Sequence, residues 1–156
     1  MLDDETIARY ARQIVIPGIG AAGQQKLLAS HALVAGNERG CRQAELYLRS
    51  AGVRVVRSAG DAEEIDVVVA ADVAALDAKT RAALVALAKP VCWYAVDEAG
   101  FTSGVHPDAG MPSATAVSIT APDAALHDAA ACEAASVACA ILAGLAFRPG
   151  RFRFEL

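Results

Sequence analysis

The chain has 156 residues, of which 55% are hydrophobic and 21% are charged, and its formal net charge is −4. This composition is typical of a folded domain with one hydrophobic core, and it excludes a disordered chain. The negative charge offers no broad attraction to nucleic acid or to an anionic membrane, so we predict neither as a partner.

The cysteines and the chain start bear on metal binding and location. Cys41, Cys92, Cys132 and Cys139 form no C-x-x-C pair, and structural zinc needs close pairs of thiolates, so we predict no zinc. The chain begins with acidic residues and does not resemble a signal peptide, which predicts a cytoplasmic protein with reduced cysteines. The apolar, uncharged run at 134–147 is too short to cross a bilayer and predicts a buried helix.

Hydrophobic periodicity and turn residues predict helices and strands that mostly alternate. In chain order, we expect helices at 3–13 and 21–29, a strand at 32–35, a helix at 41–50, strands at 53–56 and 65–70, a helix at 76–88, strands at 91–96 and 99–105, a loop to about 122, a helix at 123–147 and a strand at 151–156. The order predicts a single Rossmann-like three-layer α/β domain over residues 1–156 with a mostly parallel sheet. Residues 1–30 form a helical arm in this interpretation, and residues 31–156 form the body.

The stretch RYARQIVIPGIGAAGQQKLLASHALVAG, Arg9–Gly36, resembles the start of the ThiF/MoeB/HesA family, relatives of the ubiquitin-activating enzymes. Shorter similarities follow at 51–53, 66–72, 89–91 and 100–104, so the resemblance covers most of the chain. It implies a two-fold dimer of Rossmann-like domains. It also implies ATP- and magnesium-dependent adenylation of the C-terminal glycine of a ubiquitin-like or sulfur-carrier protein.

The loop that should bind phosphate departs from the family pattern. When G-x-G-x-x-G is aligned on Gly40, its other two glycines fall on Ala35 and Asn37, and a Cβ at the middle position crowds a phosphate. Glu38 adds negative charge where a helix N-terminus would favour an anion. The second strand ends in Arg57 instead of a ribose-binding acid, and a family segment after it is missing. We therefore expect a shortened, degenerate member of the family.

Some residues still match functional positions of the family. Gly36 and Gly40 are the remaining glycines of the cofactor loop, and Asp72 stands where a magnesium-binding aspartate is expected at the end of a strand. Arg12 belongs to an intact Arg-Tyr-x-Arg-Gln motif, whose second arginine reaches the ATP phosphates of a dimer partner in the family. Retention for packing, with Arg12 in a surface ion pair, is the alternative.

The remaining cysteine, aromatic and histidine candidates have chemical or structural interpretations. Cys41 is expected either as a low-pKa thiol at a helix N-terminus or as a small packing residue. We expect Trp93 and Tyr94 in the core with the tyrosine hydroxyl at an edge. The three histidines, His31, His106 and His127, share no metal-like spacing and are expected at the surface or as caps.

The sequence favours a protein that is non-catalytic on its own and needs no cofactor. It would act as a homodimer, with the apolar helix predicted near 124–147 at the interface, or as a silent subunit beside an active ThiF/MoeB-like enzyme or a ubiquitin-like protein. One alternative is an active adenylyltransferase that uses ATP and magnesium. Another is a small-ligand binding module that reuses the crevice.

Overall fold

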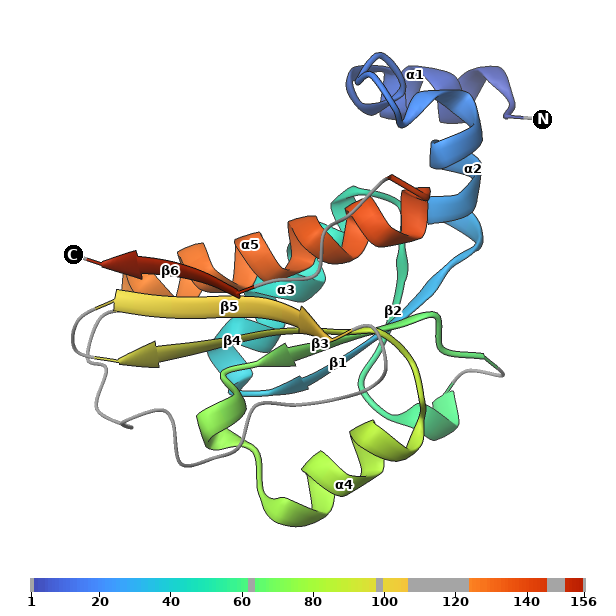
Figure 1. Ribbon diagram of the computed structural model, residues 1–156. Coiled ribbons are helices and arrows are strands. Elements are labelled where there is room, and N and C mark those ends of the chain that lie inside the picture. Colours follow the sequence, from blue (N-terminus) through green and yellow to red (C-terminus); the bar gives the residue numbers. More distant parts are fainter. Residues whose placement is uncertain (1, 62–63, 98–99, 107–123, 146–150, 156) are drawn as a thin grey trace.

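The computed structural model describes residues 2–61, 64–97, 100–106, 124–145 and 151–155 (Figure 1). The helices are α1 (Asp4–Ile14), α2 (Gly20–Ala29), α3 (Glu38–Ser50), α4 (Ala78–Ala86) and α5 (Ala124–Ala143). The strands are β1 (His31–Gly36), β2 (Arg54–Val56), β3 (Val67–Ala71), β4 (Val91–Asp97), β5 (Gly100–His106) and β6 (Arg151–Glu155). Short 3₁₀ turns lie at η1 (Ala59–Asp61) and η2 (Val73–Ala75).

The strands form one sheet in the order β2-β1-β3-β4-β5-β6. The first four strands in this order pair in parallel, whereas β5 and β6 are antiparallel to their neighbours. The predicted Rossmann-like α/β fold is therefore confirmed. Because β2 and β3 lie on opposite sides of β1, the order of winding reverses at β1, and ligand sites of such sheets lie at the carboxyl ends of the strands there.

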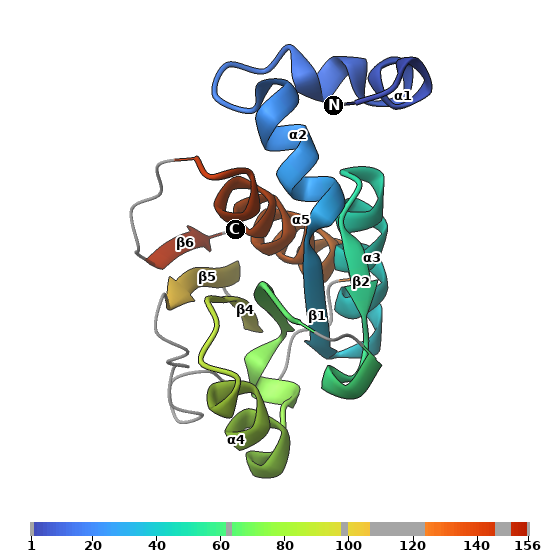
Figure 2. The same cartoon turned by 90° about the vertical axis from the view of Figure 1, so that its right-hand side faces the viewer.

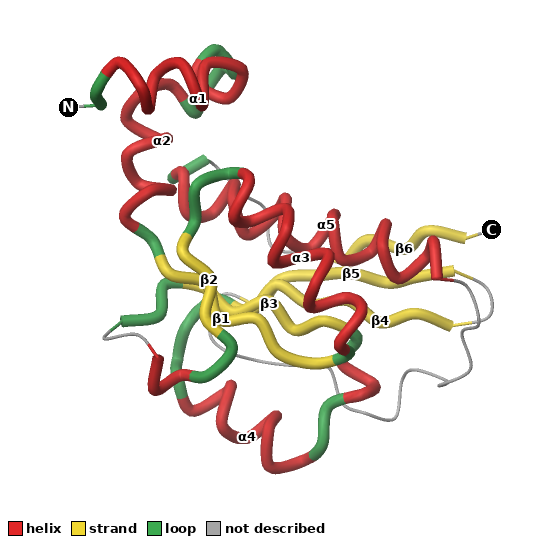
Figure 3. Tube along the Cα trace, turned by 180° about the vertical axis from the view of Figure 1, so that it is seen from behind, coloured by secondary structure: helices red, strands yellow, loops and turns green. Residues whose placement is uncertain are grey.

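Helices cover both faces of the sheet. Figures 2 and 3 show α3 and α5 together on one face and α4 on the other. The larger hydrophobic cluster joins α3, α5 and the sheet, and the smaller one joins α4 to β1, β3 and β4. Between β2 and β3 the described residues contain only the short turn η1, so no long helix of that connection covers the α4 face.

Several element boundaries differ from the sequence prediction because of helix caps. α3 begins at Glu38 and not at Cys41, since Asn37 caps it. α4 begins at Ala78 and not at Leu76, since the Asp77 carboxylate accepts a 2.6 Å hydrogen bond from the Thr80 N–H. α5 ends at Ala143, before Gly144 with φ +80°, and the last residues of its predicted extent lie outside the described ranges.

The helix α5 is longer than the uncharged run that predicted it. With 20 residues and a mean hydropathy of 1.4, it could cross a membrane by length and composition alone, so the argument that it is too short was wrong. Its inner face nevertheless packs into the larger cluster with α3 and the sheet, as a core helix does. The buried residues of α5 are Leu126, Ala130, Ala131, Ala134, Ala135, Ala138 and Ala143.

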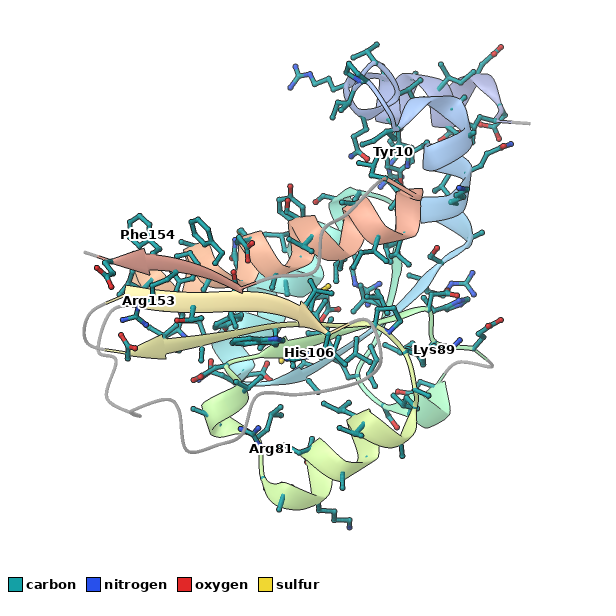
Figure 4. The ribbon with its side chains drawn as sticks, viewed as in Figure 1. Tyr10, Arg81, Lys89, His106, Arg153 and Phe154 are labelled. Carbon is teal, nitrogen blue, oxygen red and sulfur yellow. The ribbon has the colours of Figure 1, made fainter. Side chains whose placement is uncertain are left out.

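The arm formed by α1 and α2 is fastened to the carboxyl end of α3. Gln13 Nε2 donates to the Ser50 carbonyl at 3.1 Å, and the buried Gln24 Nε2 donates to the Ala51 carbonyl at 3.0 Å. The Tyr10 ring, labelled in Figure 4, is 8% exposed and lies close to Gly52. The arm thus satisfies carbonyl groups that a helix leaves without intrahelical partners at its end.

We predict that Gly36→Ala severely destabilises the fold. Gly36 has φ +127°, and a Cβ there would lie 1.9 Å from the Ala71 carbonyl oxygen, so β1 and β3 would have to separate. The free energy of unfolding in urea, followed by circular dichroism, should fall by about 3 kcal/mol or more.

Gly20→Ala is the matched control, because Gly20 also has a positive φ of +58° but open space around it. Only the backbone cost of about 1 kcal/mol is expected there. Equal losses for the two variants would contradict the close strand approach as the cause.

Candidate functional site

The candidate site lies at the carboxyl ends of β1 and β3, where the β1–α3 loop meets Asp72. Gly36 of β1 is paired with Ala71 of β3, and the next backbone N–H, that of Asn37, donates to the Ala71 carbonyl at 2.8 Å. The chain enters α3 directly after this contact. The loop is therefore tied to the neighbouring strand at the position where a nucleotide loop passes over its phosphates.

Both predicted cofactor glycines have a packing role in the fold. Gly36 allows the approach to Ala71 described above. At Gly40, a Cβ would lie 1.7 Å from the Tyr94 hydroxyl oxygen and 3.3 Å from the Ala71 Cβ. The two glycines that the loop retains therefore serve contacts inside the protein, of the kind that close packing of a helix on a sheet requires.

The first N–H groups of α3 are bound by the loop itself. Asn37 Oδ1 accepts hydrogen bonds from the N–H of Arg39 at 3.0 Å and of Gly40 at 3.2 Å. The Asn37 carbonyl accepts from the Cys41 N–H at 2.8 Å. Donors at a helix N-terminus are the groups that hold phosphate in nucleotide loops. Here a capping side chain occupies two of them.

An ion pair crosses from this loop to the end of β2. Arg57 Nη2 lies 2.7 Å from Glu38 Oε2, and Arg57 Nη1 lies 3.8 Å from Glu45. Arg57 stands where a dinucleotide-binding fold carries its ribose-binding acid. The Glu38 and Arg57 side chains are 68% and 38% exposed, so the pair contributes at most about 1 kcal/mol to stability. Its effect on the site is to set a carboxylate beside the loop.

A second ion pair joins the N-terminal turns of α3 and α5. Arg39 Nε and Nη2 donate to Asp128 Oδ1 and Oδ2 at 2.9 and 2.7 Å. The hydrogen bonds from Arg39 hold the pKa of the Asp128 carboxyl below its usual value. Glu38 itself lies 2.7 Å from Arg57 and 3.9 Å from Arg42.

Asp72 lies near Tyr94 and His127, two polar side chains that the sequence analysis does not associate with it. It is 8% exposed with φ +58°, a strained conformation for an aspartate. Burial raises the pKa of its carboxyl, while His127 and the backbone groups of Ala74 and Val96 lower it. The expected hydroxyl position at an edge was wrong for Tyr94, which is 0% exposed.

Tyr94 and His127 contact each other and complete this cluster with Asp72. Their rings meet edge-on with centroids 6.2 Å apart, and burial, together with the nearby Asp72, raises the pKa of the Tyr94 hydroxyl. Asp72 Oδ1, the Tyr94 hydroxyl and His127 Nδ1 are buried without hydrogen-bond partners among the described residues. The described part of the chain contains no group of three His, Cys, Asp or Glu side chains arranged for a metal ion.

A separate hollow of about 390 Å³ lies between the sheet and α4. Leu33, Ala35 and Leu84 contribute to its apolar lining, and Arg57 and Lys79 are its cationic residues. Its volume is in the range of small-molecule pockets. It borders the carboxyl half of β1, on the face that lacks a long helix between β2 and β3.

Arg12 is not part of this site within the chain. It is exposed on α1, in the arm that contacts the far end of α3. It makes no ion pair or hydrogen bond with any residue that the structure describes, so the alternative of a surface ion pair has no partner among them. Cys41 is 0% exposed, and burial raises the pKa of its thiol to about 11, which supports its interpretation as a packing residue.

No protein-family model matches the chain, and no curated protein is significantly similar to it. The family resemblance therefore stays a hypothesis, and functional inference depends on the geometry of the site.

We predict strong energetic coupling between Gly40 and Tyr94. Gly40→Ala should lower the free energy of unfolding by about 2 kcal/mol through overpacking against the hydroxyl. Tyr94→Phe should be neutral within about 1 kcal/mol or stabilising, because the hydroxyl is buried without a partner among the described residues. In the double variant, the Gly40→Ala loss should shrink by about 1 kcal/mol or more.

Urea denaturation of the four proteins of this cycle provides the measurement. A loss well above 2 kcal/mol for Tyr94→Phe alone would contradict the prediction, because it would mean that the hydroxyl has a hydrogen-bond partner of about that value.

Proposed function

We propose that the chain is a non-catalytic subunit of ThiF/MoeB/HesA type. It acts in the cytoplasm as a homodimer, or beside an active adenylating subunit or a ubiquitin-like protein. The observation that carries the proposal is the cap of α3, where Asn37 Oδ1 accepts from the Arg39 and Gly40 N–H groups. A triphosphate would have to displace this side chain before it could use the same donors.

The surroundings of the loop support the same conclusion. Glu38 sets a carboxylate beside any phosphate at the start of α3, and Arg57 replaces the acid that would bind a ribose. Gly40 has no room to spare, because the Tyr94 hydroxyl lies against it. An active adenylyltransferase would need a rearrangement of Glu38 and Arg57, so this alternative is the less favoured one.

Exposed apolar side chains on the arm and α3 support a role in assembly. Val15 is 77% exposed, Ile16 45%, Leu46 61% and Tyr47 41%. Ile16 and Tyr47 also line a groove of about 300 Å³ between the arm and the carboxyl end of α3. Ile16 and Tyr47 thus share one apolar hollow, and contiguous apolar surface marks interaction sites more often than scattered single residues do. The four cysteines are free thiols, as expected in a reducing cytoplasm.

The first test is a calorimetric titration of the isolated chain with Mg-ATP. We predict no binding tighter than millimolar and no exchange of pyrophosphate into ATP, because the donors of α3 are capped and Glu38 repels phosphate. A micromolar dissociation constant would overturn the proposal. An intact family enzyme titrated under the same conditions is the positive control.

The second test concerns Arg12, which would act on the ATP of an active partner. Its guanidinium is permanently charged and can hold two phosphate oxygens. Arg12→Ala should leave the fold intact, because Arg12 has no ion pair with the described residues, and should slow pyrophosphate exchange by an active partner by about tenfold or more.

The partner in that assay is a family member with an intact glycine loop, co-expressed with this chain. Arg9→Ala is a matched control, because Arg9 lies in the same motif but rests over the Tyr10 ring at 5.7 Å. An unchanged rate in a confirmed heterodimer would leave Arg12 without a catalytic role.

The hollow beneath the sheet favours a second candidate, a small-ligand binding module. Its mostly apolar lining, with Arg57, Lys79 and Asp77 as its charged residues, would suit an apolar ligand with a polar group. Thermal-shift titration with Mg-ATP, ADP, AMP and adenosine separates the candidates. Stabilisation by adenosine or AMP, with no shift by Mg-ATP, would favour the module, and no shift with any of them would favour the assembly subunit.

A further inference from the structure

The edge strand β6 has features that would allow it to pair with β6 of a second copy of the chain. β6 pairs with β5 on one side, and it is the last strand of the sheet, so its other side faces no described strand (Figure 1). Such an edge presents backbone N–H and C=O groups that can pair with another strand. The carboxyl end of the described chain lies on this edge.

Two exposed aromatic rings follow the edge on the α5 side of the sheet. Phe152 is 51% exposed and Phe154 is 43% exposed. Their ring centroids lie 6.1 and 5.4 Å from that of the buried Phe101, which belongs to the cluster that includes α5. Phe101 thus holds both rings in place while one side of each remains open to solvent.

Arg153 lies on the opposite face of β6. Its charge is paired within the domain and therefore does not oppose pairing with another strand. Its Nη1 and Nη2 donate to the Asp97 carboxylate at 2.7 and 3.0 Å, and Nη1 also donates to Thr102 Oγ1 at 2.9 Å. Figure 4 shows Arg153 and Phe154 on opposite faces of the strand. Edge strands commonly carry inward or unpaired charges that block pairing, whereas this charge is satisfied within the domain.

We propose that β6 pairs antiparallel with β6 of a second copy around a two-fold axis at Arg153, which joins the two sheets. In this register, Phe152 of each copy lies opposite Phe154 of the other, and aromatic cross-strand pairs stabilise antiparallel sheets. The sequence RFRFE is basic at its first position and acidic at its last, so antiparallel pairing sets opposite charges at both ends. Because β6 is complementary to itself in this register, the strand that fits its free edge is β6 of a second copy of the chain.

The first test measures the mass of the full chain by multi-angle light scattering at tens of micromolar. This inference rests on the proposed assembly role. The wild type should have twice the 16.0 kDa mass of one chain. The double variant Phe152→Arg, Phe154→Arg should weaken the dimer by about tenfold or more, because charges would replace the buried aromatic pairs. The comparison variant Val15→Arg, Leu46→Arg alters the competing apolar surface of the arm and α3, which this inference leaves to a different partner, and should remain dimeric.

A cysteine cross-link tests the register without removing the aromatic rings, and so covers the case in which the double variant does not fold. Directly opposed residues of antiparallel strands have Cα atoms about 4.5–5.5 Å apart, which suits a disulfide. Arg153→Cys should therefore form a disulfide-linked dimer under mild oxidation. The wild type and Glu155→Cys should not, since the two copies of residue 155 would lie about 13 Å apart.

Each outcome bears on the proposal. A monomeric wild type overturns it, and so does a dimer that survives the phenylalanine substitutions and gives no Arg153→Cys cross-link. Dissociation of the dimer by Val15→Arg, Leu46→Arg, with the phenylalanine variant still dimeric, places the interface on the arm and overturns β6 pairing. The Mg-ATP titration tests the non-catalytic role separately, so failure of the edge and failure of the proposed function are distinguishable.

Discussion

The close backbone contact between β1 and β3 determines the geometry of the whole candidate site. Gly36 lies against the Ala71 carbonyl, and the Asn37 N–H donates to the same carbonyl at 2.8 Å. This contact fixes where α3 begins, and with it the position from which Asn37 caps the helix. Gly40 then packs on Tyr94 in the next turn. A nucleotide loop needs the same N–H donors to point outward, so the tight junction and phosphate binding compete for the same groups.

The contacts at the other end of α3 give the Arg-Tyr-x-Arg-Gln motif a structural function that does not depend on nucleotide chemistry. Tyr10, Gln13 and Gln24 contact the carboxyl end of α3 and the turn at Gly52, and two of them donate to carbonyl groups there. These interactions hold the arm on the body and position α3 against the sheet. Two of the four specified residues of the Arg-Tyr-x-Arg-Gln motif, Tyr10 and Gln13, therefore have a structural function in this chain. Arg12 has no such contact among the described residues, which is why it remains the residue of that motif with a possible role in another subunit.

The parts of the fold set by local pattern could be predicted from the sequence, and the parts set by distant contacts could not. Val67–Ala71 is buried throughout, and such continuous apolar runs are typical of parallel strands. The predicted helix at 41–50 starts three residues later than α3 does, because the sequence pattern does not identify Asn37 as its cap. Glu38 and Arg57 are 19 positions apart, and Arg39 and Asp128 are 89 apart. Nothing in a single sequence links residues so far apart, so the two ion pairs beside the loop could not be predicted.

The short connection between β2 and β3 separates two properties that a nucleotide crevice normally combines. With only η1 described there, the α4 face of β1 stays partly uncovered, and Leu33, Ala35 and Leu84 line a hollow of about 390 Å³. On the polar side, Asn37 caps the donors of α3 and Glu38 pairs with Arg57. The apolar half of the crevice is therefore open while its anion-binding half is closed. Apolar binding depends on buried area and phosphate binding on free donors, so the proposed loss of ATP binding does not require the hollow to be filled.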